Sequence, residues 1–106
     1  AAVQGMAGGL RSAVAVIQAR YMATGNMAST TVTTLDSTSV TVNAGTGIPV
    51  GTALGIGAAM QSTDGFTVDY TTATAVTFRP TNGGGANCQV SYHGTTGAAT
   101  VDVSSC

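Results

Sequence analysis

Two cysteines, Cys88 and Cys106, are the residues of this sequence best suited to covalent chemistry. They lack the CxxC spacing of a zinc or redox site. An even number of cysteines in a small domain of secreted type favours a disulfide, and two buried free thiols are the alternative. A bridge between them would contribute about 3 kcal/mol to stability, and it would hold a C-terminus that otherwise frays.

The sequence also contains a serine, a histidine and an aspartate that could be drawn as a catalytic triad: Ser91, His93 and Asp102. Chance alone supplies such trios, and Ser91 does not lie in the sharp strand-to-helix turn of a nucleophile elbow. His93 is the only histidine, and it falls on the polar side of an expected strand. We interpret it as a solvated surface residue and expect the protein not to be an enzyme.

The four aspartates do not have the spacing of an EF-hand calcium loop. They are Asp36, Asp64, Asp69 and Asp102. We interpret them as solvated acids of turns and strands, with a calcium site as the alternative. The glycine-rich segment 55–60 superficially resembles a phosphate loop, but the chain has no lysine and no strand is expected before the segment. We therefore expect a flexible loop there, and neither a cofactor nor a metal.

The low fraction of charged residues limits the classes of partner that this protein could bind. Charged residues make up 7% of the 106 residues, against roughly 25% in ordinary soluble domains, and neither lysine nor glutamate occurs. A formal net charge of −1 does not favour binding to nucleic acid or to an anionic membrane surface. A surface of threonine, serine, asparagine and glycine suits a secreted or cell-surface protein that packs against copies of itself.

The first 23 residues have the periodicity of a helix with two different uncharged faces. Large side chains recur at steps of three and four. That stripe consists of Val3, Met6, Leu10, Val14, Ile17 and Tyr21. Small residues line the other side: Ala1, Gly5, Gly8, Ser12, Ala15, Ala19 and Ala23. A helix face in water normally carries lysine and glutamate, so we expect the large stripe to pack within the domain and the small face to pack against another molecule.

The ends of this helix give opposite signals. Gly25 and Asn26 tolerate the left-handed turn that commonly ends a helix. No capping residue precedes the first periodic position, since Ala1 is already in phase. We therefore expect the natural protein to continue upstream. The segment itself has no apolar run long enough to span a membrane.

The rest of the chain reads as a long loop followed by a sheet. Within residues 24–63 we expect short strands at 31–35 and 39–43, a turn at Asp36–Ser37, and a helical turn near 52–60. Within residues 64–106, four segments alternate apolar and polar residues, around 66–70, 76–79, 90–93 and 99–103. Short connections favour an antiparallel meander. The predicted fold is one α+β domain: a long N-terminal helix on a four-stranded antiparallel sheet, with an αβ-loop between them.

The expected register of the last hairpin also supports the disulfide. A turn at 94–97 places residues near Cys88 opposite Val103 and Ser104, and Cys106 follows directly after them. The bridge would therefore close the open end of that hairpin.

These features together resemble the type IV pilins. The run VQGMAGGLRSA at residues 3–13 is similar to the corresponding segment of major pilins of the mannose-sensitive haemagglutinin type, and the αβ-loop, the meander sheet and the pair Cys88 and Cys106 fit the same family. In that family a cleavage site, a phenylalanine and an apolar half-helix with a glutamate would lie upstream of Ala1. The resemblance implies that residues 88–106 form the disulfide-bounded region exposed on the fibre.

The same resemblance implies a structural function. The chain would be a subunit of an adhesive or motility fibre, anchored in the inner membrane with a periplasmic domain before assembly into the extracellular pilus. Its partners would be copies of itself, other pilins and the pilus assembly machinery, and Gly5, Gly8, Ser12, Ala15 and Ala19 would form the assembly face. The alternatives are a pseudopilin of a type II secretion system and a small extracellular binding module.

Overall fold

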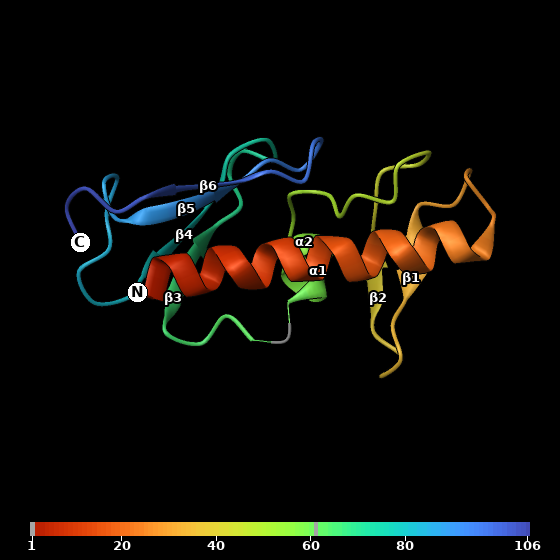
Figure 1. Ribbon diagram of the computed structural model, residues 1–106, viewed down its shortest axis with the longest axis horizontal. Coiled ribbons are helices and arrows are strands. Elements are labelled where there is room, and N and C mark those ends of the chain that lie inside the picture. Colours follow the sequence, from red (N-terminus) through yellow and green to blue (C-terminus); the bar gives the residue numbers. More distant parts are fainter. Residues whose placement is uncertain (1, 61) are drawn as a thin grey trace.

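A computed structural model describes residues 2–60 and 62–106 of the chain (Figure 1). Helix α1 (Ala2–Thr24) runs along the longest axis of a molecule that measures 43 × 24 × 19 Å. Gly25 follows it with φ of 72°, and its N–H donates to the carbonyl of Met22. The helix thus ends at the left-handed residue that the sequence predicts.

The predicted stripe of large residues is the buried face of α1. Each of its six members is at most 8% exposed, and Leu10 and Tyr21 are fully buried. Ala7 is buried with them. The 3.6-residue period therefore identified the packing face of this helix correctly.

The four-stranded sheet is the expected antiparallel meander. Its strands are β3 (Phe66–Asp69), β4 (Val76–Pro80), β5 (Gln89–Tyr92) and β6 (Ala99–Asp102), and they lie in the order β3-β4-β5-β6. In the last hairpin Gln89 pairs with Asp102 and Tyr92 pairs with Ala99. Continued by one residue, this register places Cys88 opposite Val103, as the sequence predicts.

The connecting segment contains a small second sheet and one short helix. Strands β1 (Thr31–Thr33) and β2 (Ser39–Thr41) form an antiparallel hairpin, and α2 (Ile56–Ala59) follows. Both strands are shorter than expected: the chain turns at Leu35 and Asp36 soon after β1, and beyond β2 Val42 forms an isolated bridge with Pro49. Ser37 has φ of 68° within that turn, close to the expected Asp36–Ser37 position.

Two hydrophobic clusters lie along α1, one under each sheet. The larger one joins the N-terminal part of α1 to the four-stranded sheet through Leu10, Phe78, Val90 and Tyr92, among others. The smaller one joins the C-terminal part of α1 to the hairpin, and consists of Ile17, Tyr21, Val32, Val40 and Val42. Figure 1 shows one helix crossing both sheets in turn, with α2 lying between them.

Candidate assembly surface

The small-residue face of α1 is exposed to solvent in the monomer. Gly5, Gly8, Ser12, Ala15 and Ala19 are all exposed. A Cβ atom built on Gly5 or Gly8 would meet nothing within 4 Å. These glycines are therefore not required by packing inside the domain, although each weakens the helix by roughly 1 kcal/mol relative to alanine.

A groove of about 850 Å³ runs beside this face. Gly5, Ser12 and Val16 of α1 form part of one wall, while Leu35 and Met60 contribute from the hairpin turn and from the residue after α2. Leu35 is 91% exposed and Val16 is 58% exposed, so the rim carries unburied apolar side chains. The sequence did not predict the groove, because its walls come from elements far apart in the chain. The one signal was a leucine directly before the polar turn Asp36–Ser37.

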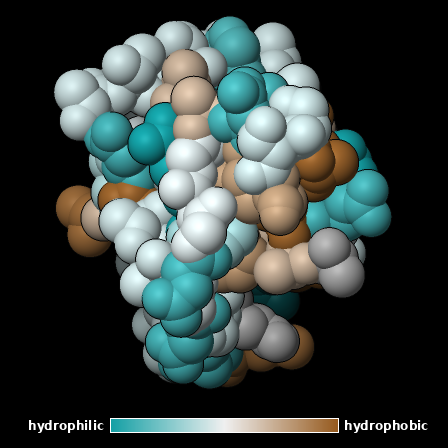
Figure 2. All heavy atoms as spheres, turned by 90° about the vertical axis from the view of Figure 1, so that its left-hand side faces the viewer, coloured by the Kyte–Doolittle hydropathy of each residue, from teal (hydrophilic) through white to brown (hydrophobic). Residues whose placement is uncertain are grey.

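The surface is weakly polar rather than charged. Figure 2 views the end of the molecule that carries both termini, where pale side chains of neutral hydropathy lie between hydrophilic ones and apolar side chains emerge at several places. This matches a chain with 7% charged residues. A surface of this kind costs less to desolvate against another protein than one that carries many ionised groups.

The arginines of α1 are used within the domain. The guanidinium of Arg11 donates to the carbonyl of Ala99 at 3.0 Å, and Nε of Arg20 donates to the carbonyl of Thr33 at 3.0 Å. Each therefore ties the helix to a strand of one sheet: Arg11 to β6 and Arg20 to β1.

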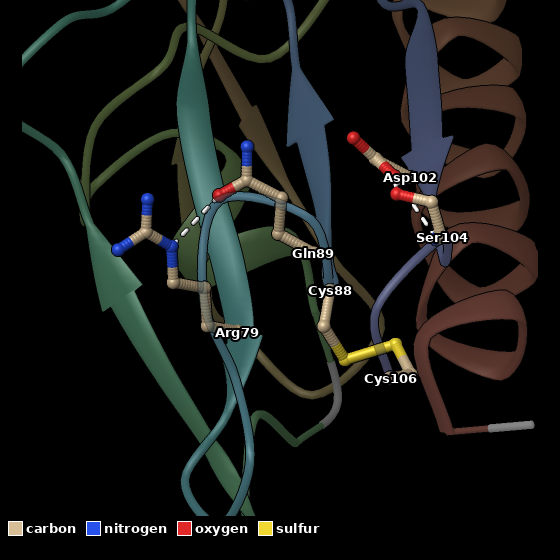
Figure 3. Close-up of a disulfide and its surroundings, with 6 residues drawn as sticks. All are labelled: Arg79, Cys88, Gln89, Asp102, Ser104 and Cys106. Atoms are coloured by element: carbon tan, nitrogen blue, oxygen red, sulfur yellow. Dashed lines mark hydrogen bonds between the residues drawn. A yellow bond between two sulfur atoms is a disulfide. The ribbon is translucent and has the colours of Figure 1, made fainter.

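The predicted disulfide joins Cys88 to Cys106, whose Cα atoms are 4.8 Å apart (Figure 3). Cys88 is buried directly before β5, and the bridge brings Cys106 back to it. On the neighbouring strand β4, Nε of Arg79 donates to Oε1 of Gln89 at 2.7 Å. The bridge and this pair hold the same end of the sheet.

The residues of the notional triad have separate structural roles. Nδ1 of His93 accepts from the backbone N–H groups of Thr95 and Thr96, at 3.1 and 3.4 Å. His93 is thus a half-buried turn residue just after β5, which corrects its interpretation as a solvated surface side chain. Asp102 accepts from both the N–H and the hydroxyl of Ser104. Among the described residues no hydrogen bond joins Ser91, His93 and Asp102.

Three of the four aspartates stabilise turns by the same local contact. Asp36, Asp69 and Asp102 each accept a hydrogen bond from the backbone N–H two residues later. Hydrogen bonding to the charged carboxylate holds the pKa of each of the three groups below its usual value. The largest cause is hydrogen bonding from Thr34 for Asp36, from Thr71 for Asp69 and from Ser104 for Asp102. Within residues 2–60 and 62–106, no three acidic, cysteine or histidine side chains gather in a way that could hold a metal ion.

Two buried tyrosines connect elements that are distant in the sequence. The hydroxyl of Tyr21 lies 2.8 Å from the carbonyl of Met27 and 2.9 Å from that of Ser29, and it accepts from the N–H of Gly45. The hydroxyl of Tyr92 donates to the carbonyl of Pro49 at 2.8 Å. Burial raises the pKa of Tyr92 well above the usual range. The helical period placed the Tyr21 ring in the core, but local sequence gave no sign of these hydrogen bonds.

Comparison with protein-family models, with curated proteins and with solved structures found no match to this chain. The architecture is nevertheless consistent with a pilin-like fold: a long N-terminal helix lies on a four-stranded antiparallel sheet with a C-terminal disulfide. The disulfide indicates an oxidising compartment outside the cytoplasm. No helix in the described part of the chain is both long and apolar enough to cross a membrane.

Proposed function

We propose that this chain is a structural subunit of a type IV pilus fibre that assembles by packing α1 against the helices of neighbouring copies. The observation that carries the proposal is the division of α1 into a buried stripe of large residues and an exposed face of small ones. The solvent-facing side of a surface helix in an ordinary monomer normally carries charged or polar residues. Alanine favours a helix but adds no polarity there, and each glycine weakens the helix by roughly 1 kcal/mol relative to alanine, so this face fits close packing against another molecule better than exposure to water.

The resemblance of residues 3–13 to major pilins of the mannose-sensitive haemagglutinin type supports the finer assignment, together with the pilin-like architecture. In this proposal the sheet and loops face outward on an extracellular fibre used in adhesion or motility. The partners are copies of the chain, other pilins and the assembly machinery. Before assembly the subunit is anchored in the inner membrane. The protein has no catalytic role.

The test is to add bulk to the exposed face without disturbing the domain. Gly8→Leu should abolish fibres, seen by electron microscopy and in the sheared extracellular fraction of cells that make the protein. The monomer should stay folded, because a Cβ on Gly8 meets nothing within 4 Å and leucine favours a helix by about 1 kcal/mol relative to glycine. Gly5→Leu should act in the same way.

Two controls separate bulk on this face from other effects. Gly8→Ala adds one carbon at the same position and should leave most fibre formation intact. Thr67→Leu adds bulk to an exposed position of β3, on another side of the molecule, and should assemble normally. Normal fibres from both leucine variants of the helix would rule out packing through this face.

A further inference from the structure

The loop between β4 and β5 contains an asparagine followed directly by glycine, Asn82–Gly83. It lies at the end of the molecule where both termini are found (Figure 1). Both residues are exposed, and a Cβ built on Gly83 would meet nothing within 4 Å. Gly83 also has φ of 86°, a conformation that residues with a side chain rarely adopt. Nothing therefore crowds the peptide bond between the two residues.

The backbone on either side of this dipeptide is hydrogen-bonded, whereas the structure as described shows no such bond for the dipeptide itself. The N–H of Thr81 donates to Gly65 at 2.9 Å, and the N–H of Gly84 donates to Pro80 at 3.0 Å. Within the described ranges, no hydrogen bond engages the side-chain amide of Asn82 or the N–H of Gly83. The amide carbonyl and the following nitrogen are thus free of contacts that would have to break before they could react with each other.

The other three asparagines differ from Asn82 in ways that matter for this reaction. Nδ2 of Asn43 donates to the carbonyls of Ile48 and Gly94, at 3.0 and 2.6 Å. Oδ1 of Asn26 accepts from the N–H of Ala28. Asn26, Asn43 and Asn87 are followed by Met, Ala and Cys, whose side chains hinder attack by the next backbone nitrogen. Only Asn82 precedes glycine.

We propose that Asn82–Gly83 is a site of spontaneous covalent modification, at which the side-chain amide is lost through a cyclic imide. The backbone nitrogen of Gly83 attacks Cγ of Asn82 and forms a new N–Cγ bond. The bond from Cγ to the side-chain nitrogen breaks, and the proton from the Gly83 N–H leaves with that nitrogen as ammonia. The product is a five-membered succinimide, and no electrons are exchanged with another molecule.

Water then opens the ring at either of its two carbonyl carbons. Opening at Cγ returns the normal backbone with aspartate at position 82, and opening at the backbone carbonyl leaves isoaspartate, with one additional carbon in the main chain. The water proton returns to the nitrogen and the hydroxyl becomes a carboxylate. Either product adds one negative charge to a chain whose formal net charge is −1. This inference does not depend on the proposed fibre function.

The folded, disulfide-bonded protein should be aged in mildly alkaline buffer at physiological temperature and followed by intact mass. The expected change is a gain of about 1 Da, as NH₂ is replaced by OH. Trypsin is poorly suited to locating the change, because Arg79 is followed by Pro80. After reduction, cleavage beyond Phe78 and Tyr92 by chymotrypsin gives the peptide 79–92, in which Asn82 and Asn87 can be distinguished by fragmentation.

The early mass gain should be located at Asn82 and accompanied by release of ammonia, while the other three asparagines stay intact in the same digests. Asn82→Ser removes the reacting amide at an exposed position and should abolish the early gain. The isolated peptide 79–92 serves as the unfolded reference. If that peptide changes while folded Asn82 does not, or if Asn26 or Asn87 changes first, the proposal is wrong.

Discussion

The two sheets along α1 are held to the helix by different means. The four-stranded sheet has the larger hydrophobic cluster, and a disulfide closes its last hairpin. The hairpin of β1 and β2 has a cluster of five residues, and its support is polar: the Tyr21 hydroxyl meets three backbone groups, and Arg20 caps a carbonyl of β1. Where apolar area is small, hydrogen bonds to loop backbone therefore take over part of the stabilisation.

The difference also predicts which part of the molecule opens first. A two-stranded hairpin alone is at best marginally stable in water, so β1 and β2 depend on α1 and on the loops around Tyr21. The four-stranded sheet has enough strands and enough buried area to be stable once the helix covers it. We expect the hairpin region to open before the large sheet does.

Loss of the disulfide should have the largest effect and should be confined to the large sheet. The double variant Cys88→Ser/Cys106→Ser is expected to lower the free energy of unfolding by about 3 kcal/mol, because the unfolded chain is no longer constrained. Urea unfolding measures the total change. Hydrogen exchange should show faster opening in β5 and β6, with β1 and β2 unchanged below the global transition. Equal acceleration in both sheets would mean that the two regions open together.

Removal of the Tyr21 hydroxyl should affect the hairpin region in the complementary way. Tyr21→Phe keeps the buried ring but leaves the groups on Met27, Ser29 and Gly45 without this partner, and should cost about 1–3 kcal/mol. Exchange in 25–45 should accelerate. The matched variant Tyr92→Phe loses one bond, to Pro49, and should affect the large sheet instead. If Tyr21→Phe accelerated exchange only in β3–β6, the assignment of this hydroxyl to the hairpin region would fail.

The same contrast explains how far the sequence could be read. Val3, Leu10 and Tyr21 repeat at helical spacing, and Val90 and Tyr92 alternate along a strand, so local periods specified α1 and the meander. Register then placed Cys88 near the C-terminus. These features depend on neighbours within one or two elements, which is the range over which hydrophobic periodicity is informative.

The remaining features depend on contacts between distant segments. The groove beside Gly5 needs the hairpin turn at Leu35 to approach α1, and no local pattern indicates that approach. The contact of Arg11 with Ala99 joins residues 88 apart in sequence. His93 was misinterpreted for a related reason: its position after β5 was predicted, but a ring that accepts from the next turn cannot be recognised from strand alternation.

Acidification should give the smallest effect, and it acts on both regions. The folded-state pKa values of Asp36, Asp69 and Asp102 lie below their usual values, so the folded protein binds fewer protons than the unfolded chain. Their contribution is therefore fully present above the unfolded pKa, about 3.9, and is lost as the pH falls through the lower folded values. The Tm should be flat near neutrality and fall below about pH 4, modestly because all three carboxylates are exposed.

Asp36 lies in the hairpin turn, whereas Asp69 and Asp102 end β3 and β6. Asp36→Asn keeps an oxygen acceptor but cannot ionise, so it should reduce the acid sensitivity of exchange in β1 and β2 alone, after correction for the intrinsic pH dependence. Asp102→Asn should do the same for β6 alone, and a Tm that rises on acidification would show that these carboxylates do not stabilise the folded state.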